Sequence, residues 1–240
     1  MWWIAAAMAG EEAPDAAWVL HPGEFRNNAW TLPKGAFTLR PFLKSSYGLT
    51  SRIDVKAPIL GEILGPKLSV EFGLVNTEPL AISLEPYLDA GWRFRNWELG
   101  VVARVSIVAG EGWFNLNVGG AAGHVFFTEE IQAADGSESE VVVDAPVQLV
   151  PVNLGYDWTL QERTWVRFVV TTDVAALAAA RTPFTAGVNW NHAFGRVRVA
   201  LGGALVVQRA VRAAVPVPGQ VALVRSATYP APTVEVWGRW

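Results

Sequence analysis

Apolar and polar residues alternate along most of this chain, with the two-residue period that predicts β-strands. Several alternating rows run for ten residues or more, whereas strands of soluble proteins average about five or six. A tilted strand needs about that greater length to cross a bilayer. The helical period is nearly absent, and the alanine-rich stretch 174–181 is interpreted as part of a loop. The pattern therefore predicts an all-β fold made of unusually long strands.

Eleven strands are predicted from these rows, and a twelfth within 16–31 would complete an even number. Bacterial single-chain membrane barrels have even strand numbers, so twelve is preferred and ten is the fallback. Pro22 and Gly23 interrupt the alternation of the twelfth. The eleven ranges are 36–48, 52–59, 67–75, 79–93, 96–108, 112–127, 143–158, 164–173, 184–194, 196–209 and 229–240.

The connections fall into two groups at opposite ends of the predicted strands. Long links are expected near 60–66, 128–140, 174–183 and 210–228, all at one end. Very short links are expected near 50–51, 76–77, 110–111, 161–162 and 195 at the other end. A short link at 95–96 is the exception, because it falls at the long-loop end. Short turns at one end and longer loops at the other are typical of up-and-down antiparallel barrels of the outer membrane.

Charged residues within the strands indicate which face of the barrel is apolar. A soluble barrel places its apolar row inside, and a membrane barrel places it outside. The polar rows carry both signs of charge interleaved with small residues, which suits a narrow lumen filled by ion pairs and water. Lumen-facing charges are therefore predicted at Arg40, Lys44, Asp54, Lys56, Lys67, Glu71, Glu85, Asp89, Glu98, Arg104, Asp157, Arg167, Arg196, Arg198, Glu235 and Arg239.

Tryptophans cluster at predicted strand ends, where their amphipathic rings would suit the headgroup zone of a bilayer. The alternative, that these rings fill a core, predicts positions in the middle of strands. The expected interfacial girdle consists of Trp92, Trp97, Trp113, Trp158, Trp165 and Trp240.

Composition narrows the class of protein further. Of 240 residues, 51% are hydrophobic and 17% are charged, against about 25% charged in soluble domains. No apolar run of about 18 residues exists, which excludes a helical membrane span. The absence of cysteine excludes disulfide scaffolds and thiolate chemistry, and a net charge of −3 argues against nucleic-acid binding.

The chain start predicts export. Residues 1–9 are apolar and end in Ala7-Met8-Ala9, the small-x-small pattern of a signal-peptidase site, so they are interpreted as the remnant of a signal peptide. An apolar start that packs on the fold is the alternative. Residues 10–34 then form an N-terminal segment that could hold the first strand, and residues 35–240 form the barrel.

The last residues, Thr233-Val234-Glu235-Val236-Trp237-Gly238-Arg239-Trp240, resemble the closing strand of bacterial outer-membrane β-barrels. The segments 31–35 and 47–54 are also similar to the opening of uncharacterised barrels from Gram-negative bacteria. The resemblance implies insertion in the outer membrane, contact with lipopolysaccharide and recognition of the closing strand by the barrel-assembly machinery. The usual final residue of that family is Phe, and Gly238 stands where a bulky residue is commoner.

No motif for catalysis, metal or cofactor is found. His21, His124 and His192 share no metal-ligand spacing, and no nucleophile elbow or phosphate loop is present. The acidic stretch 129–140 matches no EF-hand loop and is interpreted as solvated. A barrel of twelve strands is intermediate in diameter between small barrels filled by side chains and porins with an open channel. Inward Phe42, Tyr87 and Trp237 would narrow its lumen.

The preferred hypothesis is a non-enzymatic outer-membrane barrel that serves as a structural component or as a narrow or plugged pore. Two alternatives stay open. The first is an outer-membrane enzyme acting on lipid or lipopolysaccharide, with a Ser/His or Asp/His cluster at a rim. The second is a soluble lipocalin-like carrier, which requires Leu68, Val70 and Phe72 to point inward.

Overall fold

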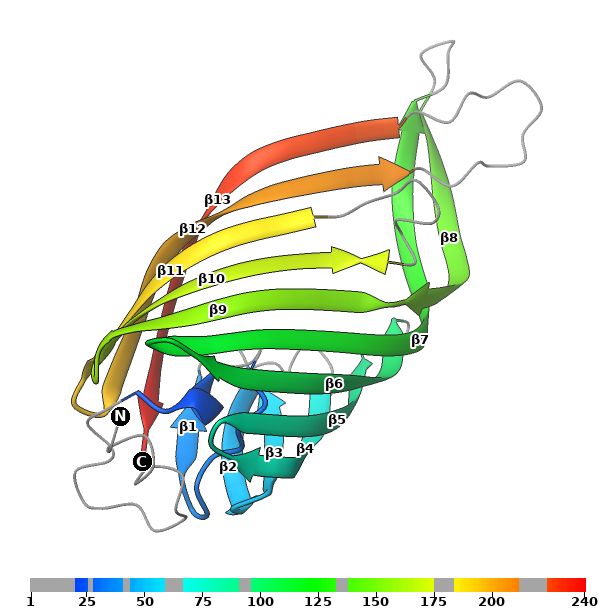
Figure 1. Ribbon diagram of the computed structural model, residues 1–240. Coiled ribbons are helices and arrows are strands. Elements are labelled where there is room, and N and C mark those ends of the chain that lie inside the picture. Colours follow the sequence, from blue (N-terminus) through cyan, green and yellow to red (C-terminus); the bar gives the residue numbers. More distant parts are fainter. Residues whose placement is uncertain are drawn as a thin grey trace.

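The computed structural model describes residues 20–25, 28–40, 44–58, 67–90, 96–132, 138–174, 184–211 and 224–240. These residues form a closed antiparallel β-barrel of twelve strands, as predicted (Figure 1). Within this described part, no helix is long and apolar enough to cross a bilayer.

The strands follow the predicted rows closely, with shifts of a few residues at most ends. Their bounds are β1 Phe37–Leu39, β2 Lys44–Thr50, β3 Ile53–Pro58, β4 Lys67–Thr77, β5 Leu80–Ala90, β6 Trp97–Ala109, β7 Gly112–Gln132, β8 Glu138–Leu149, β9 Pro151–Gln161, β10 Thr164–Asp173, β11 Phe184–Phe194, β12 Val197–Val211 and β13 Val224–Arg239.

Twelve of these thirteen strands make the ring, and β8 lies outside it. The first part of β7 pairs with β9 from Gly112 to Val118, and its second part pairs with β8 from Ala121 to Gln132. The predicted strand 143–158 is therefore two strands, separated at Val150. The stretch 128–140, expected as a loop, continues β7 to Gln132 and starts β8 at Glu138. Figure 1 shows this hairpin rising beyond the other strands.

The connections sort to the two ends of the barrel as expected. Two-residue turns at 51–52, 78–79, 110–111, 162–163 and 195–196 share one end, called here the turn end. The links 59–66, 91–96, 133–137, 174–183 and 212–223, and the single residue Val150 between β8 and β9, join strands at the opposite end. The link near 95–96, which was expected to be short although it falls at the end with the long loops, does join β5 and β6 at this loop end. Up-and-down neighbours are joined alternately at the two ends, and all five two-residue turns among the described residues fall at the turn end.

The twelfth strand is not where the sequence predicted it. The predicted strand 36–48 is divided into β1 and β2, which supplies the missing member of the ring. Residues 20–25 and 28–31 contain no strand and instead include a short 3-10 helix, η2 (Pro22–Glu24). Proline fixes its backbone for the first turn of a helix and cannot donate to a ladder, which explains why Pro22 starts a turn here.

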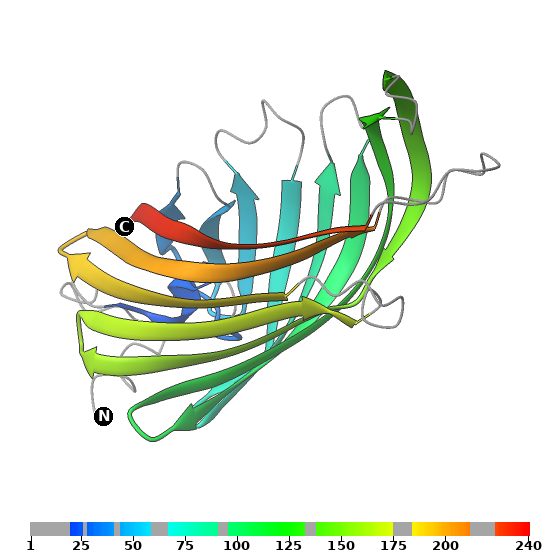
Figure 2. The ribbon, with the colours of Figure 1, turned by 90° about the horizontal axis from the view of Figure 1, so that it is seen from above.

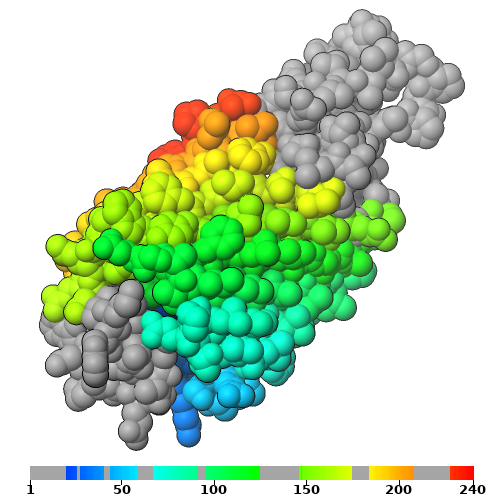
Figure 3. Space-filling model, viewed as in Figure 1, coloured from blue at the N-terminus to red at the C-terminus, as the bar shows by residue number. Residues whose placement is uncertain are grey.

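The apolar rows face outward and the polar rows face inward. Leu68, Phe72 and Leu201 are exposed on the outer face, whereas Glu85 and Arg198 are buried in the lumen. Side chains of neighbouring strands cover the outer face shown in Figure 3. The soluble-carrier alternative is therefore wrong, because it required the row of Leu68 and Phe72 to line the interior.

Candidate functional site in the lumen

Residues 20–25 and 28–33, called here the inner segment, lie inside the ring near its turn end (Figure 2). All of them are buried. The turn η2 is closed by a capping box: the His21 side chain accepts a hydrogen bond from the Gly23 N–H at 3.0 Å, and the His21 N–H donates to Glu24 Oε1 at 3.1 Å. Gly23 is required here because a Cβ would lie 2.8 Å from the backbone of Thr31 and Trp30. The segment is thus folded tightly on itself.

The fully buried carboxylate of Glu24 joins the inner segment to the last two strands of the barrel. Its oxygens accept hydrogen bonds from Arg198 Nε at 2.9 Å and from Arg239 Nη1 at 2.9 Å. The indole N–H of Trp237 donates to the same carboxylate at 3.0 Å. Charge-assisted bonds of this kind are about twice as strong as neutral ones. Glu24 therefore anchors the inner segment to β12 and β13.

Further hydrogen bonds fix the inner segment to the rest of the ring. The Leu20 N–H donates to the Glu162 carbonyl at 3.2 Å, and the Ala29 N–H donates to Ser106 Oγ at 2.9 Å. The Leu32 N–H donates to Asp54 Oδ2 at 2.8 Å. These partners lie on β3, β6 and the β9–β10 turn, so the segment spans the lumen from wall to wall.

Aromatic rings pack around the inner segment. The ring of Phe25 stacks on Trp165 at 5.0 Å between centroids and meets Trp237 edge-on at 6.1 Å. Trp113 lies 4.6 Å from Trp165 and 6.0 Å from Trp30. Aromatic pairs contribute about 0.5–1.5 kcal/mol beyond the area that they bury. Together these rings form an apolar layer across the lumen at the turn end, called here the aromatic floor.

Trp113 and Trp165 are therefore not girdle residues, and that prediction is corrected. Both are 1% exposed and face the lumen. Trp113 is two residues from Asn115 and Trp165 is two residues from Arg167, so each lies on the same face of its strand as an inward polar side chain. Trp97, Trp158 and Trp240 are exposed on the outside at 43%, 41% and 48%. Trp92 lies outside the described residues, as do Phe42 and residues 1–9.

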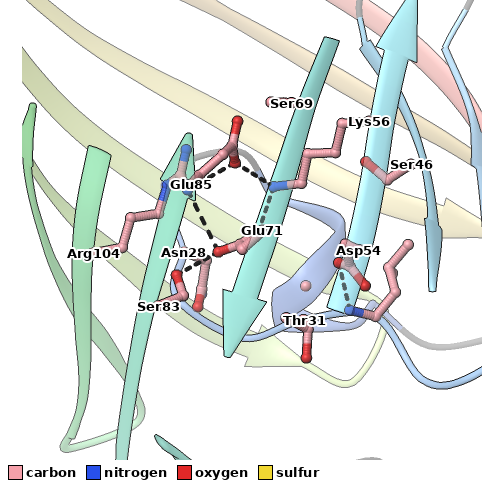
Figure 4. A network of polar contacts seen from close by, with 12 residues as sticks. Asn28, Thr31, Ser46, Asp54, Lys56, Ser69, Glu71, Ser83, Glu85 and Arg104 are labelled. Atoms are coloured by element: carbon pink, nitrogen blue, oxygen red, sulfur yellow. Dashed lines mark hydrogen bonds and ion pairs between the residues drawn. The ribbon is translucent and has the colours of Figure 1, made fainter. Parts of the chain in front are cut away.

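A second cluster of charges lies on the wall formed by β3 to β6 (Figure 4). Lys56 Nζ is 2.8 Å from Glu85 Oε2 and also pairs with Glu71. Arg104 Nη1 is 2.7 Å from Glu85 Oε2 and 3.5 Å from Glu71 Oε1. The Ser83 hydroxyl donates to Glu71. Two cations and two carboxylates, all nearly buried, thus compensate one another.

The other predicted lumen charges occupy several environments. Arg167 pairs with Asp157 at 2.6 Å and 3.0 Å, Lys67 with Asp89 at 2.8 Å, and Arg40 with Glu235. The Tyr87 hydroxyl donates to Glu98. Lys44 lies 5.5 Å from the Tyr87 ring centroid. Arg196 is a correction: it is exposed in the β11–β12 turn, one residue beyond the alternating row.

A cavity of about 210 Å³ separates the inner segment from this charged wall. Its lining combines Gly23, Glu24 and Phe25 of the inner segment with Ser46 and the charged side chains of Arg40, Lys44, Lys56, Glu85 and Arg104. The lining carries four cations and two carboxylates.

The sequence did not identify Glu24 or the inner segment as part of the lumen. No periodic signal marks residues 20–33, because an irregular segment has no repeating face. The inward orientation of Trp113 and Trp165 could be predicted from the alternation, since Asn115, Asn117 and Arg167 occupy the same face of their strands.

The histidines do not gather into a site. His192 lies on the outer face between Trp190, whose ring is stacked at 5.3 Å, and Phe194, and its Nδ1 is 2.7 Å from the Thr164 hydroxyl. His21 caps η2, and His124 lies on β7 opposite Trp97. In the described ranges, no three His, Cys, Asp or Glu residues are placed to hold a metal.

Comparison of the chain with protein-family models, curated proteins and solved structures finds no match.

Proposed function

We propose that the chain is an integral outer-membrane β-barrel of a Gram-negative bacterium whose lumen is closed by its own inner segment. The observation that carries the membrane assignment is the orientation of the wall. Large apolar side chains point outward on every long strand whose side chains are described, and the charges are paired inside. Burying that outer face against acyl chains and lipopolysaccharide would remove the exposed apolar surface from water.

The closed lumen supports a structural role, without catalysis, over that of an open pore. The inner segment contacts β3, β6, β12 and β13 and packs on three inward tryptophans at the turn end. A solute that crosses the turn end would meet this segment, which the ion cluster of Glu24 with Arg198 and Arg239 holds in place. Removing one member of such a buried ion cluster costs about 3–5 kcal/mol.

Reconstitution into lipid vesicles tests the membrane assignment. The folded chain should float with the vesicles after urea washing and should migrate faster on a gel before boiling than after it. A chain that stays in the aqueous fraction while folded would contradict the proposal.

Planar-bilayer recording tests the closure. The unmodified barrel should be silent, and Glu24→Lys should produce steady current steps because a third cation would be repelled by Arg198 and Arg239. The matched control is Glu162→Lys, which makes the same change of charge in an exposed turn. Large steps from the unmodified protein, or equal currents from both variants, would show that the inner segment does not close the lumen.

A further inference from the structure

A second cavity, of about 420 Å³, lies at the turn end, between the aromatic floor and three turns that are neighbours in the ring. These turns are β4–β5, β6–β7 and β9–β10. Backbone bonds hold them in place, because the Val108 N–H donates to the Pro79 carbonyl and the Thr159 N–H donates to the Glu111 carbonyl, both at 2.9 Å. Figure 1 shows the β6–β7 and β9–β10 turns side by side. The cavity is framed by fixed backbone, and its size is usual for small-molecule sites, which measure about 300–1,000 Å³.

The charged side chains that line this turn-end cavity are all acidic. Glu78, Glu111 and Glu162 come from one turn each, and all three are exposed. The indole N–H of Trp158 donates to the Glu111 carboxylate at 3.3 Å. The described lining contains no lysine or arginine. Because no three acidic or histidine side chains in the described part of the chain are placed to hold a metal ion, the charge favours an organic cation.

Two polar groups in the wall of the turn-end cavity lack a hydrogen-bond partner among the described residues. They are the indole N–H of Trp113, whose side chain is almost completely buried, and the hydroxyl of Thr159. A buried donor without an acceptor is costly, so a ligand that brings an acceptor to this wall would be favoured. An ammonium group cannot accept a hydrogen bond, whereas a hydroxyl can accept from Trp113 and can also bond to Thr159.

Apolar groups complete the lining. Val108 packs against the aromatic floor, and Leu160 contributes an aliphatic side chain beside it in the lining. Small-molecule sites commonly combine such an apolar wall with a few polar groups that fix the orientation of the ligand. The matching ligand has a saturated carbon skeleton that carries both ammonium groups and hydroxyls.

We propose that the turn-end cavity binds a polyhydroxylated cyclic amine, the chemistry that amino sugars and aminocyclitols share. Its ammonium groups pair with Glu78 and Glu111, and one ring hydroxyl accepts a hydrogen bond from Trp113. Its carbon ring lies against Val108 and Leu160. The inference goes beyond the proposed function, because it requires a folded barrel but neither a bilayer nor an open lumen.

Isothermal titration calorimetry tests the site on the full chain, folded in a neutral detergent at low ionic strength. The probe is 2-deoxystreptamine, a cyclohexane ring that carries ammonium groups and hydroxyls. The analogue cis-1,3-diaminocyclohexane keeps the ammonium groups and lacks the hydroxyls. Inositol keeps the hydroxyls and lacks the charges. We expect 2-deoxystreptamine to bind about tenfold more tightly than either analogue, since each lacks one class of contact.

Carboxylate variants test the charge contacts. The double variant Glu78→Gln/Glu111→Gln should weaken binding of 2-deoxystreptamine about tenfold, as expected for two exposed charge pairs. Glu98→Gln is the matched control, because it neutralises a carboxylate at the loop end of β6 and should leave the affinity unchanged.

Tryptophan variants test the hydroxyl contact. Trp113→Phe removes the indole N–H and should reduce the preference for 2-deoxystreptamine over cis-1,3-diaminocyclohexane from about tenfold to about threefold. Trp165→Phe is the matched control: it removes another indole N–H of the aromatic floor that has no partner among the described residues, but Trp165 does not line the cavity. It should keep the preference. If Trp113→Phe does not fold, Thr159→Val should lower the preference in the same direction.

Four results would overturn the site. No binding of 2-deoxystreptamine would mean that the cavity has no such ligand. Equal affinity for cis-1,3-diaminocyclohexane would mean that the acidic turns attract any amine. Equal affinity for inositol would mean that charge plays no part. An equal loss of preference in Trp113→Phe and Trp165→Phe would mean that the aromatic floor acts only through the fold. The membrane assignment is independent of these results, since vesicle flotation tests it separately.

Discussion

Glu24 shows how much one buried carboxylate can organise. An isolated charge inside a protein is costly, and only partners with good geometry offset that cost. Glu24 has two guanidinium groups, the indole of Trp237 and a backbone N–H within hydrogen-bond distance. Because Glu24 and its charged partners come from opposite ends of the sequence, the ion cluster can form only once the inner segment has docked against β12 and β13.

The inward tryptophans should contribute more to stability than the outward ones. Trp165→Ala removes a fully buried ring that packs on Phe25 and Trp113, at a cost of about 3–5 kcal/mol. Trp158→Ala, on the neighbouring strand, removes a ring of the outer face whose indole N–H donates to Glu111, and should lower the free energy of unfolding in detergent by only about 1 kcal/mol. Urea titration followed by gel mobility measures both. Equal losses would mean that the aromatic floor does not hold the structure together.

Buried and exposed ion pairs in the same wall should also differ. Glu71→Ala leaves Lys56 and Arg104 to share Glu85, and should cost about 3–5 kcal/mol. Asp89→Asn breaks the Lys67 pair, whose side chains are 39% and 35% exposed, and should cost about 0–1 kcal/mol. The same urea titration compares them. A cost for Asp89→Asn as large as that for Glu71→Ala would show that the lumen screens neither pair.

Strands are the elements that sequence pattern identifies well, because every second side chain meets the same environment. Leu201 and Arg198 lie on opposite faces of β12, as their alternation required. The pattern could not show that 36–48 is two strands, since β1 and β2 continue the same alternation across their link. It also could not locate the inner segment, whose burial depends on contacts with β3, β6, β12 and β13 that the local sequence does not record.

In the proposed membrane location, the outward face of β12 should tolerate charge according to its depth in the bilayer. Leu201→Arg places a cation near the middle of the apolar belt and should cost about 2–4 kcal/mol, whereas Val197→Arg, next to the tight turn, should cost about 0–1 kcal/mol. The two residues have nearly equal exposure, 46% and 48%, so depth is the variable that separates them. Folding into vesicles at increasing urea concentration measures the difference. A soluble barrel would show no such dependence on depth.

The two ends of the whole molecule are built differently, and this difference should set its orientation in the proposed outer membrane. The turn end has two-residue turns and is filled by the inner segment, whereas the other end bears the long β7–β8 hairpin. In outer-membrane barrels the long loops face the outside of the cell and the short turns face the periplasm. A protease site inserted at 135–136, between β7 and β8, should therefore be cut by protease added to intact cells. The same site inserted at 195–196 should be cut only after the outer membrane is permeabilised. Cleavage at 195–196 in intact cells, with 135–136 protected, would show that the barrel has the opposite orientation. The inner segment would then lie at the end that faces the outside of the cell.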